Sequence, residues 1–239
     1  MPFAFVVALF SVLFRRVEVV YFADGVAGAM APLLRPFGSA RFVVTIYALE
    51  MTYGNWLART LMKRGALCCD RVVAISQYSR QLAVGAGIPQ DKVEVVQVGI
   101  EPTMVPADRR RDLARQFEAE HGLRFGSDRI LLNFGRLIPR KGVAAFLEKG
   151  MPLLDSDIKL VVCGGGPDFE RIASLHTRPE LQERFVLLEH QPEEIVAMFR
   201  QSADLFLFPN VPTPNDAEGF GMTQLESMYA GLPVVAFAV

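Results

Sequence analysis

The stretch DAEGFGMTQLESMYAGLPVV, residues 216–235, decides the fold prediction. A Gly-Phe-Gly turn precedes a helical segment that is expected to begin near Met222 or Thr223, and a strand follows the helix. Glu218 and Glu226 stand eight positions apart around the turn. The first turn of a helix presents unpaired backbone N–H groups, which favour an anion. The stretch therefore predicts an anion-binding loop between a strand and a helix.

Composition narrows the class of protein. The 239 residues include 25 Lys and Arg against 26 Asp and Glu, so no cationic excess is available to hold nucleic acid by charge. We expect no nucleic-acid partner. Cys68 and Cys69 are adjacent and Cys163 is remote, which cannot form a regular disulfide framework and indicates a reducing, cytoplasmic setting.

The opening run, residues 2–14, is apolar over 13 positions and is followed by Arg15 and Arg16. A membrane-spanning helix requires about 20 residues. The run also lacks the basic start and the small-residue cleavage site of a signal peptide. The first interpretation is a buried helix, and the second is an interfacial anchor that makes peripheral contact with the inner face of a membrane. A signal sequence is the third.

Short apolar runs alternate with helical stretches along the chain. Candidate strands lie at 17–22, 42–47, 72–75, 93–96, 130–134, 158–163, 185–188, 205–208 and 234–237. Segments such as 54–67, 76–87 and 192–203 carry apolar residues at spacings of three and four, which is typical of helices that cross over a parallel sheet. Two prolines and a charged run interrupt the pattern near residue 105. An α/β protein with two domains, 1–105 and 106–239, is the simplest prediction.

Ligands of open parallel sheets bind beyond the carboxyl ends of the strands. After the strand 130–134, the loop GRLIPRKG places Arg136 and Lys141 before a helix. After 158–163, three glycines allow close backbone approach, and Pro167 suits a helix's first turn. A hydrogen bond to a charged group contributes about 1.5–3 kcal/mol and a helix terminus about 0.3–1 kcal/mol, so we expect the two cations to dominate anion binding.

Two glutamates beside an anion site require a ligand that also carries hydroxyls. A sugar nucleotide has a diphosphate between a sugar and a ribose. Glu226, in the second helical turn, would lean toward the helix N-terminus and accept both ribose hydroxyls, while Glu218 would accept from the sugar. The alternative is structural: Thr223 and Glu226 have the spacing of a capping box, in which Glu226 bonds only backbone N–H groups.

The segments GRLIPRKG, VVCGGGP and EGFGMTQLESMYAGLPVVA, in this order and spacing, resemble the nucleotide-binding half of the retaining glycosyltransferases of family 4, which have the GT-B fold. The similarity extends upstream through DRVVAISQYSRQLAVGAGIPQDKVEVV. The resemblance implies two Rossmann-like domains, the first on the acceptor side. It also implies a role in cell-envelope polysaccharide synthesis, with a nucleoside-diphosphate sugar as donor and a glycan or lipid-linked acceptor.

The resemblance also assigns roles to residues. Arg136 and Lys141 hold the diphosphate, Glu226 holds the ribose, and Glu218 with the backbone of 219–223 holds the donor sugar and phosphate. The residues of that loop are Gly219, Phe220, Gly221, Met222 and Thr223, and Glu218 is the catalytic candidate. The implied reaction retains the anomeric configuration and uses no metal or other cofactor.

One departure concerns the acceptor side. Where members of the family commonly carry a histidine after a strand, this chain has Tyr47 in TIYALE. A tyrosine can hydrogen-bond a substrate, but it cannot replace every function of an imidazole near neutral pH. Tyr47 is therefore either a substrate contact or a side chain that packs at the domain interface. His121, His176 and His190 share no metal-like spacing, and no metal site is expected.

A second departure concerns the ends. Complete members begin with a strand and a glycine-rich loop, for which no counterpart precedes residue 17, and they continue beyond VVAFAV. The first domain is therefore expected to be incomplete and its opening helix partly uncovered, which favours self-association. Three functions follow: a glycosyltransferase, a nucleotide-sugar-binding fragment that needs a partner chain, and, least favoured, a sugar-nucleotide epimerase.

Overall fold

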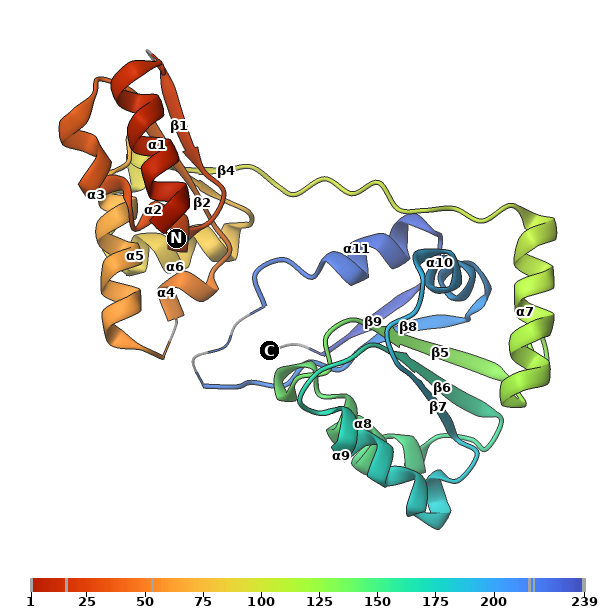
Figure 1. Ribbon diagram of the computed structural model, residues 1–239. Helices are drawn as coiled ribbons and strands as arrows, with labels where there is room; N and C mark the ends of the chain where they lie inside the picture. Colours follow the sequence, from red (N-terminus) through yellow and green to blue (C-terminus); the bar gives the residue numbers. More distant parts are fainter. Residues whose placement is uncertain (1, 16, 53, 215, 217, 238–239) are drawn as a thin grey trace. The chain divides into compact units, whose positions relative to one another are not determined.

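The computed structural model describes residues 2–15, 17–52, 54–214, 216 and 218–237, so Arg16 lies outside the described residues. The chain divides into two compact units. The first contains residues 1–99 and 214–220, and the second contains residues 100–213 and 221–239. Each unit is built on its own parallel sheet (Figure 1).

The first unit carries a four-stranded parallel sheet in the order β1-β2-β3-β4. Its strands are β1 (Val19–Phe22), β2 (Arg41–Ile46), β3 (Arg71–Ala74) and β4 (Val93–Val95). Its α-helices are α1 (Pro2–Phe14), α2 (Gly25–Gly28), α3 (Ala31–Leu34), α4 (Leu49–Thr52), α5 (Trp56–Cys68) and α6 (Gln77–Gly85), with 3₁₀ turns η1 (Arg35–Phe37) and η2 (Gln90–Lys92). Helices separate consecutive strands because parallel neighbours require crossover connections.

The core of the first unit lies on one face of β2. Phe42, Val44 and Ile46 alternate along the strand and are fully buried, as the period of two requires. Phe22 of β1 meets Phe42 edge to face at 5.7 Å between ring centroids. Burial of each such side chain contributes about 1.5–3 kcal/mol to the stability of the unit.

The second unit carries a five-stranded parallel sheet in the order β7-β6-β5-β8-β9. Its strands are β5 (Arg129–Phe134), β6 (Ile158–Cys163), β7 (Phe185–Leu188), β8 (Leu205–Phe208) and β9 (Val234–Ala236). Its α-helices are α7 (Ala107–His121), α8 (Val143–Lys149), α9 (Phe169–Ser174), α10 (Glu193–Ser202) and α11 (Met222–Tyr229), with 3₁₀ turns η3 (Pro139–Lys141), η4 (Met151–Leu153), η5 (Leu175–Thr177) and η6 (Pro179–Leu181).

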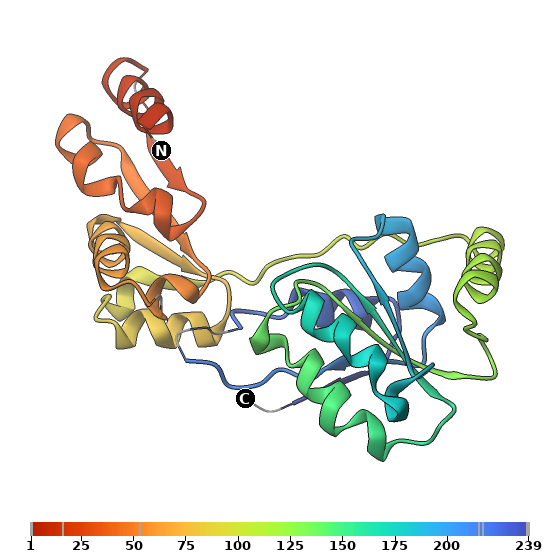
Figure 2. The same ribbon diagram turned by 60° about the horizontal axis from the view of Figure 1, so that its bottom comes forward.

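Helices cover both faces of this second sheet (Figure 2). Alternate residues of β6 serve the two faces: Val161 packs with α7 and α10, whereas Leu160 and Val162 pack with α8 and α9. Strands buried on both faces are near-continuous apolar runs, which is why they were recognisable in the sequence. This is the doubly wound Rossmann-like arrangement that the sequence predicts.

The predicted α/β class and all nine predicted strands are confirmed, with boundaries within two residues of the observed ones. The three quoted helical segments are also present, as α5, α6 and α10. The prediction for Pro167 is wrong, because α9 begins two residues later with Asp168 as its N-cap. The observed division differs from a single cut at residue 105. It falls after Gly99, and residues 214–220 group with the first unit.

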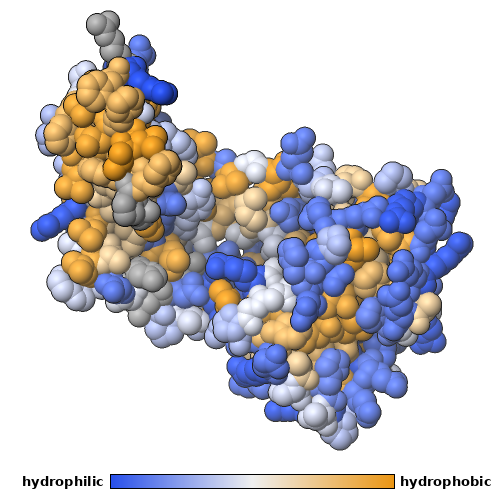
Figure 3. Space-filling model, in the orientation of Figure 1, coloured by the Kyte–Doolittle hydropathy of each residue, from blue (hydrophilic) through white to orange (hydrophobic). Residues whose placement is uncertain are grey.

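The interpretation of α1 as a buried helix is wrong for one of its faces. Val12 is buried against Gly38, but a stripe of large apolar side chains is exposed. The exposed residues are Phe3, Val6, Val7, Phe10, Leu13 and Phe14. They give the continuous apolar area over α1 at the upper left of Figure 3. No helix within the described part of the chain has the length and apolarity that a membrane crossing requires.

Candidate functional site

The loops that follow β5 and β6 touch each other at Gly135. A Cβ added to Gly164 would lie 1.9 Å from the Gly135 carbonyl oxygen, so only glycine permits this approach. The Leu137 N–H donates to the Gly165 carbonyl at 2.9 Å and continues the contact. A Cβ at Gly135 would lie 3.7 Å from Cγ2 of Thr223, in the first turn of α11. The two loops and the start of α11 therefore meet beyond the carboxyl ends of the strands.

The loop after β8 joins the same edge of the sheet. The Val211 N–H donates to the Arg140 carbonyl at 2.9 Å, and Gly142 (φ +67°) lies directly against the Pro209 carbonyl. Lys141, between these two contacts, places Nζ 4.4 Å from the ring centroid of Phe208. The sequence-predicted cation thus lies at the carboxyl end of β8.

Arg136 follows β5 by two residues, and its side chain is exposed. It directly follows Gly135, which lies close to Thr223 in the first turn of α11. Arg136 and Lys141 therefore both lie in loops at the carboxyl edge of the second sheet. A charged donor on each side suits a diphosphate, which has two anionic centres.

Helix α11 begins as predicted, at Met222, and Gly221 (φ +80°) is its N-cap. No side chain caps the helix, so the capping-box alternative is wrong for this structure. Thr223 is the second helical residue, and its buried Oγ1 has no hydrogen-bond partner among the described residues. The Glu226 carboxylate instead accepts a hydrogen bond from Arg200 at 3.0 Å. The first-turn N–H groups of α11 are therefore not satisfied by a side-chain cap.

The carboxyl group of Glu226 has a perturbed environment. Burial raises its pKa above the ordinary value and is the largest cause. The Arg200 guanidinium opposes this effect by favouring the charged form, and the negative charge of Glu193 reinforces it. The Glu226 carboxyl group is therefore half-buried and ion-paired with Arg200 near the start of α11.

Four predicted site residues group with the first unit: Tyr47, Glu218, Gly219 and Phe220. The Ser76 hydroxyl, at the start of α6, donates to the Gly219 carbonyl at 2.7 Å. A Cβ at Gly219 would lie 2.2 Å from the Tyr47 carbonyl oxygen. A side chain at position 219 would therefore clash with the backbone that follows β2. This contact is a second reason for a glycine at this position, in addition to the predicted turn.

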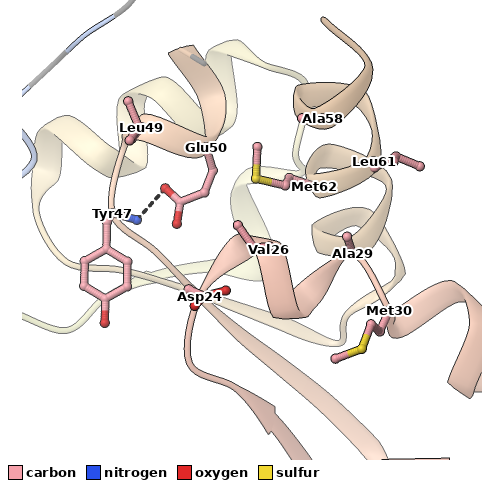
Figure 4. Close-up of a pocket in the computed structure, with 10 residues that line it drawn as sticks. All are labelled: Asp24, Val26, Ala29, Met30, Tyr47, Leu49, Glu50, Ala58, Leu61 and Met62. Carbon is pink, nitrogen blue, oxygen red and sulfur yellow. Dashed lines mark hydrogen bonds between the residues drawn. The ribbon is translucent and has the colours of Figure 1, made fainter. Parts of the chain in front are cut away.

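Tyr47 also lines a cavity of about 760 Å³ within the first unit. The cavity walls are mostly apolar and come from α2 and the residues beside it, from the segment after β2, and from α4 and α5 (Figure 4). They are formed by Asp24, Val26, Ala29, Met30, Tyr47, Leu49, Glu50, Ala58, Leu61 and Met62. Such a space accommodates a small organic group, and the exposed Asp24 carboxylate is available for polar contacts.

Glu50 holds the backbone around this cavity. Its side chain is 7% exposed, and its carboxylate accepts from the N–H of Tyr47 at 2.9 Å and of Gly25 at 3.3 Å. Ala48, between Tyr47 and Glu50, has φ +91°, which is costly for a residue other than glycine. Such strained residues are often found at functional sites, where the surrounding structure maintains them. Glu50 could not be predicted from the sequence, because TIYALE carries no pattern that marks it.

Arg200 was also not among the residues predicted from the sequence, although its position on α10 indicates that it is buried. It follows Glu193 and Val196 on α10 at spacings of seven and four, so it shares their helical face. A charged residue in line with the buried Val196 indicates a buried ion pair. Arg200 is in fact 1% exposed and is paired with Glu193 and Glu226.

The cysteines offer no reactive thiol in the core. All three are free, and burial raises the pKa of Cys69 and of Cys163 to about 12. Across the described ranges, no three His, Cys, Asp or Glu side chains gather closely enough to hold a metal ion.

Comparison with known proteins adds family models for both parts of the chain. The model described as "Glycosyl transferases group 1" matches residues 114–239. The model described as "Glycosyltransferase Family 4" matches residues 1–103. The two matches cover both units and meet near the boundary between them.

Individual relatives agree with these models. A GDP-mannose-dependent alpha-(1-6)-phosphatidylinositol monomannoside mannosyltransferase of Mycolicibacterium smegmatis is 29% identical over 227 residues, which are 92% of this chain and 58% of the relative. A D-inositol 3-phosphate glycosyltransferase of Nocardia farcinica is 31% identical over 178 residues, which are 70% of this chain and 37% of the relative. The chain thus spans less than two thirds of the length of these relatives.

Solved structures show the same fold. Anabaena HepE, solved with UDP and glucose, superposes with a TM-score of 0.79 at 18% identity, over 98% of this chain and 61% of the other. A sucrose-phosphate synthase from Thermosynechococcus elongatus gives a TM-score of 0.70 at 19% identity, over 93% of this chain and 56% of the other. The two sheets of this chain are therefore those of a GT-B fold.

Proposed function

The chain belongs to the glycosyl transferases group 1 family, and from this membership we propose that it transfers a sugar from a nucleoside-diphosphate donor to a glycan or glycolipid acceptor with retention of configuration. The relatives support this type of reaction: one is named for GDP-mannose and a phosphatidylinositol mannoside, and HepE was solved with UDP and glucose. The nucleotide of the proposed donor is GDP or UDP, as in these two proteins, and the sugar is not part of the proposal.

One observation carries the donor site. The loops after β5, β6 and β8 and the first turn of α11 contact one another at Gly135 and Gly142, at the carboxyl edge of one sheet. Open parallel sheets bind their ligands at this edge. In the proposal, Arg136 and Lys141 hold the diphosphate together with the uncapped N–H groups at Met222 and Thr223.

Glu226 is proposed to bind the ribose. Its carboxylate can accept hydrogen bonds only, which suits adjacent hydroxyls. Oε2 already accepts from Arg200, and Oε1 has no donor among the described residues. The proposed ribose contact therefore uses an acceptor that the folded chain leaves available.

Glu218, Gly219 and Phe220 are proposed to contact the donor sugar, with Glu218 as the catalytic candidate. Tyr47 is the second candidate, on the acceptor side. The close contact between Gly219 and the Tyr47 carbonyl supports a common function, because it joins the two segments within the first unit. The proposed transfer needs no metal ion, since the positive charge that offsets the departing diphosphate comes from Arg136 and Lys141.

The acceptor is proposed to bind in the cavity of the first unit beside Tyr47. Its volume of about 760 Å³ and apolar walls suit the hydrophobic part of a glycolipid, and the exposed carboxylate of Asp24 suits a hydroxyl group. The same proposal places the protein in cell-envelope polysaccharide synthesis, in the cytoplasm and at the inner face of the membrane. The exposed stripe on α1 and the excess of ten Lys and Arg over six Asp and Glu in residues 1–99 support contact with an anionic surface.

A second candidate function is a nucleotide-sugar-binding part that requires another polypeptide for turnover. The exposed stripe on α1 favours association with a partner or with itself. Light scattering separates the two: a stable, active monomer supports the transferase, and turnover only after addition of a partner supports the second candidate.

The experiment that tests the proposed function measures donor binding and transfer separately. Calorimetry with GDP and UDP detects the nucleotide site. Nucleotide release from GDP-mannose and UDP-glucose in the presence of glycolipid acceptors detects transfer, and the anomeric proton signal of the product reports its configuration. Heat of binding without release supports the second candidate. A folded chain that binds neither nucleotide contradicts both.

A further inference from the structure

Arg200 is a buried arginine that is paired with two glutamates of the second unit. It lies near the end of α10 and is 1% exposed, which makes it one of the largest fully buried side chains of the described chain. A guanidinium remains charged at any ordinary pH, so its burial requires acceptors. Nη1 donates to Oε2 of Glu226 at 3.0 Å, and Nη2 donates to Glu193. The guanidinium carbon also lies 5.5 Å from the ring centroid of Phe134.

This arrangement leaves one buried donor of Arg200 unsatisfied within the described chain. The Nε atom of Arg200 is buried and has no hydrogen-bond partner among the described residues. A buried donor without a partner costs about 1–3 kcal/mol. Apolar side chains of similar volume often replace buried ion pairs without loss of stability. The cluster of Arg200, Glu193 and Glu226 therefore calls for a functional explanation.

We propose that Arg200 is a positioning residue of the donor site, which orients the Glu226 carboxylate toward the adjacent hydroxyls of the donor ribose. The inference rests on the proposed function and deepens it. Arg200 contacts no substrate itself. It acts through one oxygen of Glu226 and leaves the other for the ligand.

The geometry gives Arg200 this role in two ways. First, a carboxylate at the end of a flexible side chain has several rotamers, and a hydrogen bond to a fixed, buried donor selects one of them. Holding Glu226 before the ligand arrives lowers the entropy that binding must offset. Second, the positive charge of Arg200 reduces the repulsion between Glu226 and the nearby diphosphate. A glutamate at the start of an anion-binding helix is thereby tolerated.

The test compares ribonucleotides with analogues that lack the ribose hydroxyls. Calorimetry on the full chain measures the affinity for GDP and UDP and for their 2′,3′-dideoxy forms. The unaltered chain is expected to prefer the ribonucleotides. Arg200→Lys keeps the charge but loses the two-pronged donor, and it should weaken ribonucleotide binding about tenfold while changing dideoxynucleotide binding less than about twofold.

Three further variants separate positioning from a merely structural role. Arg184→Lys alters another partly buried arginine of the second unit, which donates to the Leu154 carbonyl, and it should leave the ribose preference unchanged. Glu193→Gln changes a side chain that is 56% exposed, so it should fold and keep the preference, because Arg200 still contacts Glu226. The double variant Arg200→Lys/Glu226→Gln should lose no more of the preference for ribonucleotides than Glu226→Gln loses alone, because Arg200 acts only through Glu226.

The outcomes distinguish this inference from the proposed function. No binding of either nucleotide by the unaltered chain contradicts the proposed function, and the role of Arg200 is then lost with it. Ribose-selective binding that persists in Arg200→Lys overturns only the role of Arg200. Equal weakening of ribonucleotides and dideoxynucleotides in Arg200→Lys also overturns it, since a damaged fold has that effect. If Arg200→Lys does not fold, loss of the ribose preference in Glu193→Gln overturns the proposed role of Arg200 instead.

Discussion

Gly142 lies directly against Pro209: a Cβ at Gly142 would come within 1.9 Å of the Pro209 carbonyl oxygen, and the backbone of Gly142 has φ +67°. This contact joins the loop after β5 to the loop after β8 in the second unit. Lys141 precedes it and lies beside Phe208. The placement of a proposed phosphate-binding lysine thus depends on the absence of one methyl group.

Gly142→Ala should therefore reduce both stability and nucleotide affinity. The positive φ and the backbone clash together are expected to lower the free energy of unfolding by about 1–3 kcal/mol. Gly122→Ala is a matched control, because Gly122 has φ +68° and open space around its Cβ position. It should cost about 1 kcal/mol and leave GDP and UDP binding intact. Urea denaturation and calorimetry measure the two effects, and equal losses in both variants would contradict the role of the Pro209 contact.

Arg136→Ala and Lys141→Ala should each weaken binding of a nucleoside diphosphate by at least about tenfold, because a charged hydrogen bond contributes about 1.5–3 kcal/mol. Lys149→Ala removes an exposed cation at the end of α8 and serves as the control. Calorimetry with GDP and UDP provides the measurement. Unchanged affinity in both site variants would remove the phosphate assignment.

Glu50→Ala should destabilise the first unit. The substitution leaves the N–H groups of Tyr47 and Gly25 without their carboxylate acceptor, at a cost of about 1–3 kcal/mol for each buried group. Glu50→Gln keeps one acceptor oxygen and should therefore lose less stability than Glu50→Ala. Glu94→Ala, at a side chain that is 65% exposed, is the control. Thermal unfolding of the three variants tests the order, and a Glu50→Ala protein as stable as Glu94→Ala would contradict it.

Asp70 should make the stability depend on pH in the acidic range. The hydrogen bonds from Arg35 are the main cause that lowers the pKa of Asp70 to about 2, and the Phe42 N–H contributes. Because the folded-state pKa lies below the unfolded value, the stabilisation is present above about pH 4 and is lost as the pH falls toward about 2.

Asp70→Asn tests this dependence. At pH 7 the variant should lose about 1 kcal/mol, after allowance for solvent screening at a carboxylate that is 37% exposed, and the loss should shrink toward pH 2. Asp108→Asn, at a side chain that is 91% exposed, should show no such change. Urea midpoints between pH 2 and pH 7 give the comparison, and a loss that does not vary with pH would rule out the Arg35 pair as its cause.

The exposed stripe on α1 should mediate association. Phe3→Asp, at a residue that is 82% exposed, should reduce sedimentation with anionic phospholipid vesicles and the apparent size in light scattering. Leu153→Asp, at a residue that is 84% exposed in the second unit, is the matched control and should change neither. Loss of vesicle binding alone identifies a membrane surface, and loss of self-association alone identifies a protein surface. No change in either would contradict both proposals.

Much of the fold could be predicted because parallel strands are buried on both faces and form short apolar runs, as in Ile158–Cys163. The start of α11 was predictable because Gly221 marks a backbone position with positive φ. The environment of Glu226 was not predictable from the sequence. Its partner Arg200 is 26 residues away, and a local spacing that resembles a capping box gave no information about that contact.

The amino-acid sequence was sufficient to predict the periodic elements, the parallel sheets and the loops in which glycines and cations follow strands, because these features depend on short-range patterns. The three-dimensional fold was needed to show that residues 214–220 group with the first unit, that Glu50 accepts from two backbone N–H groups and that α1 leaves one face exposed. Those outcomes depend on contacts between residues distant in the chain, and the physical cost of an unpaired buried group or an uncovered apolar surface appears only once its neighbours are in place.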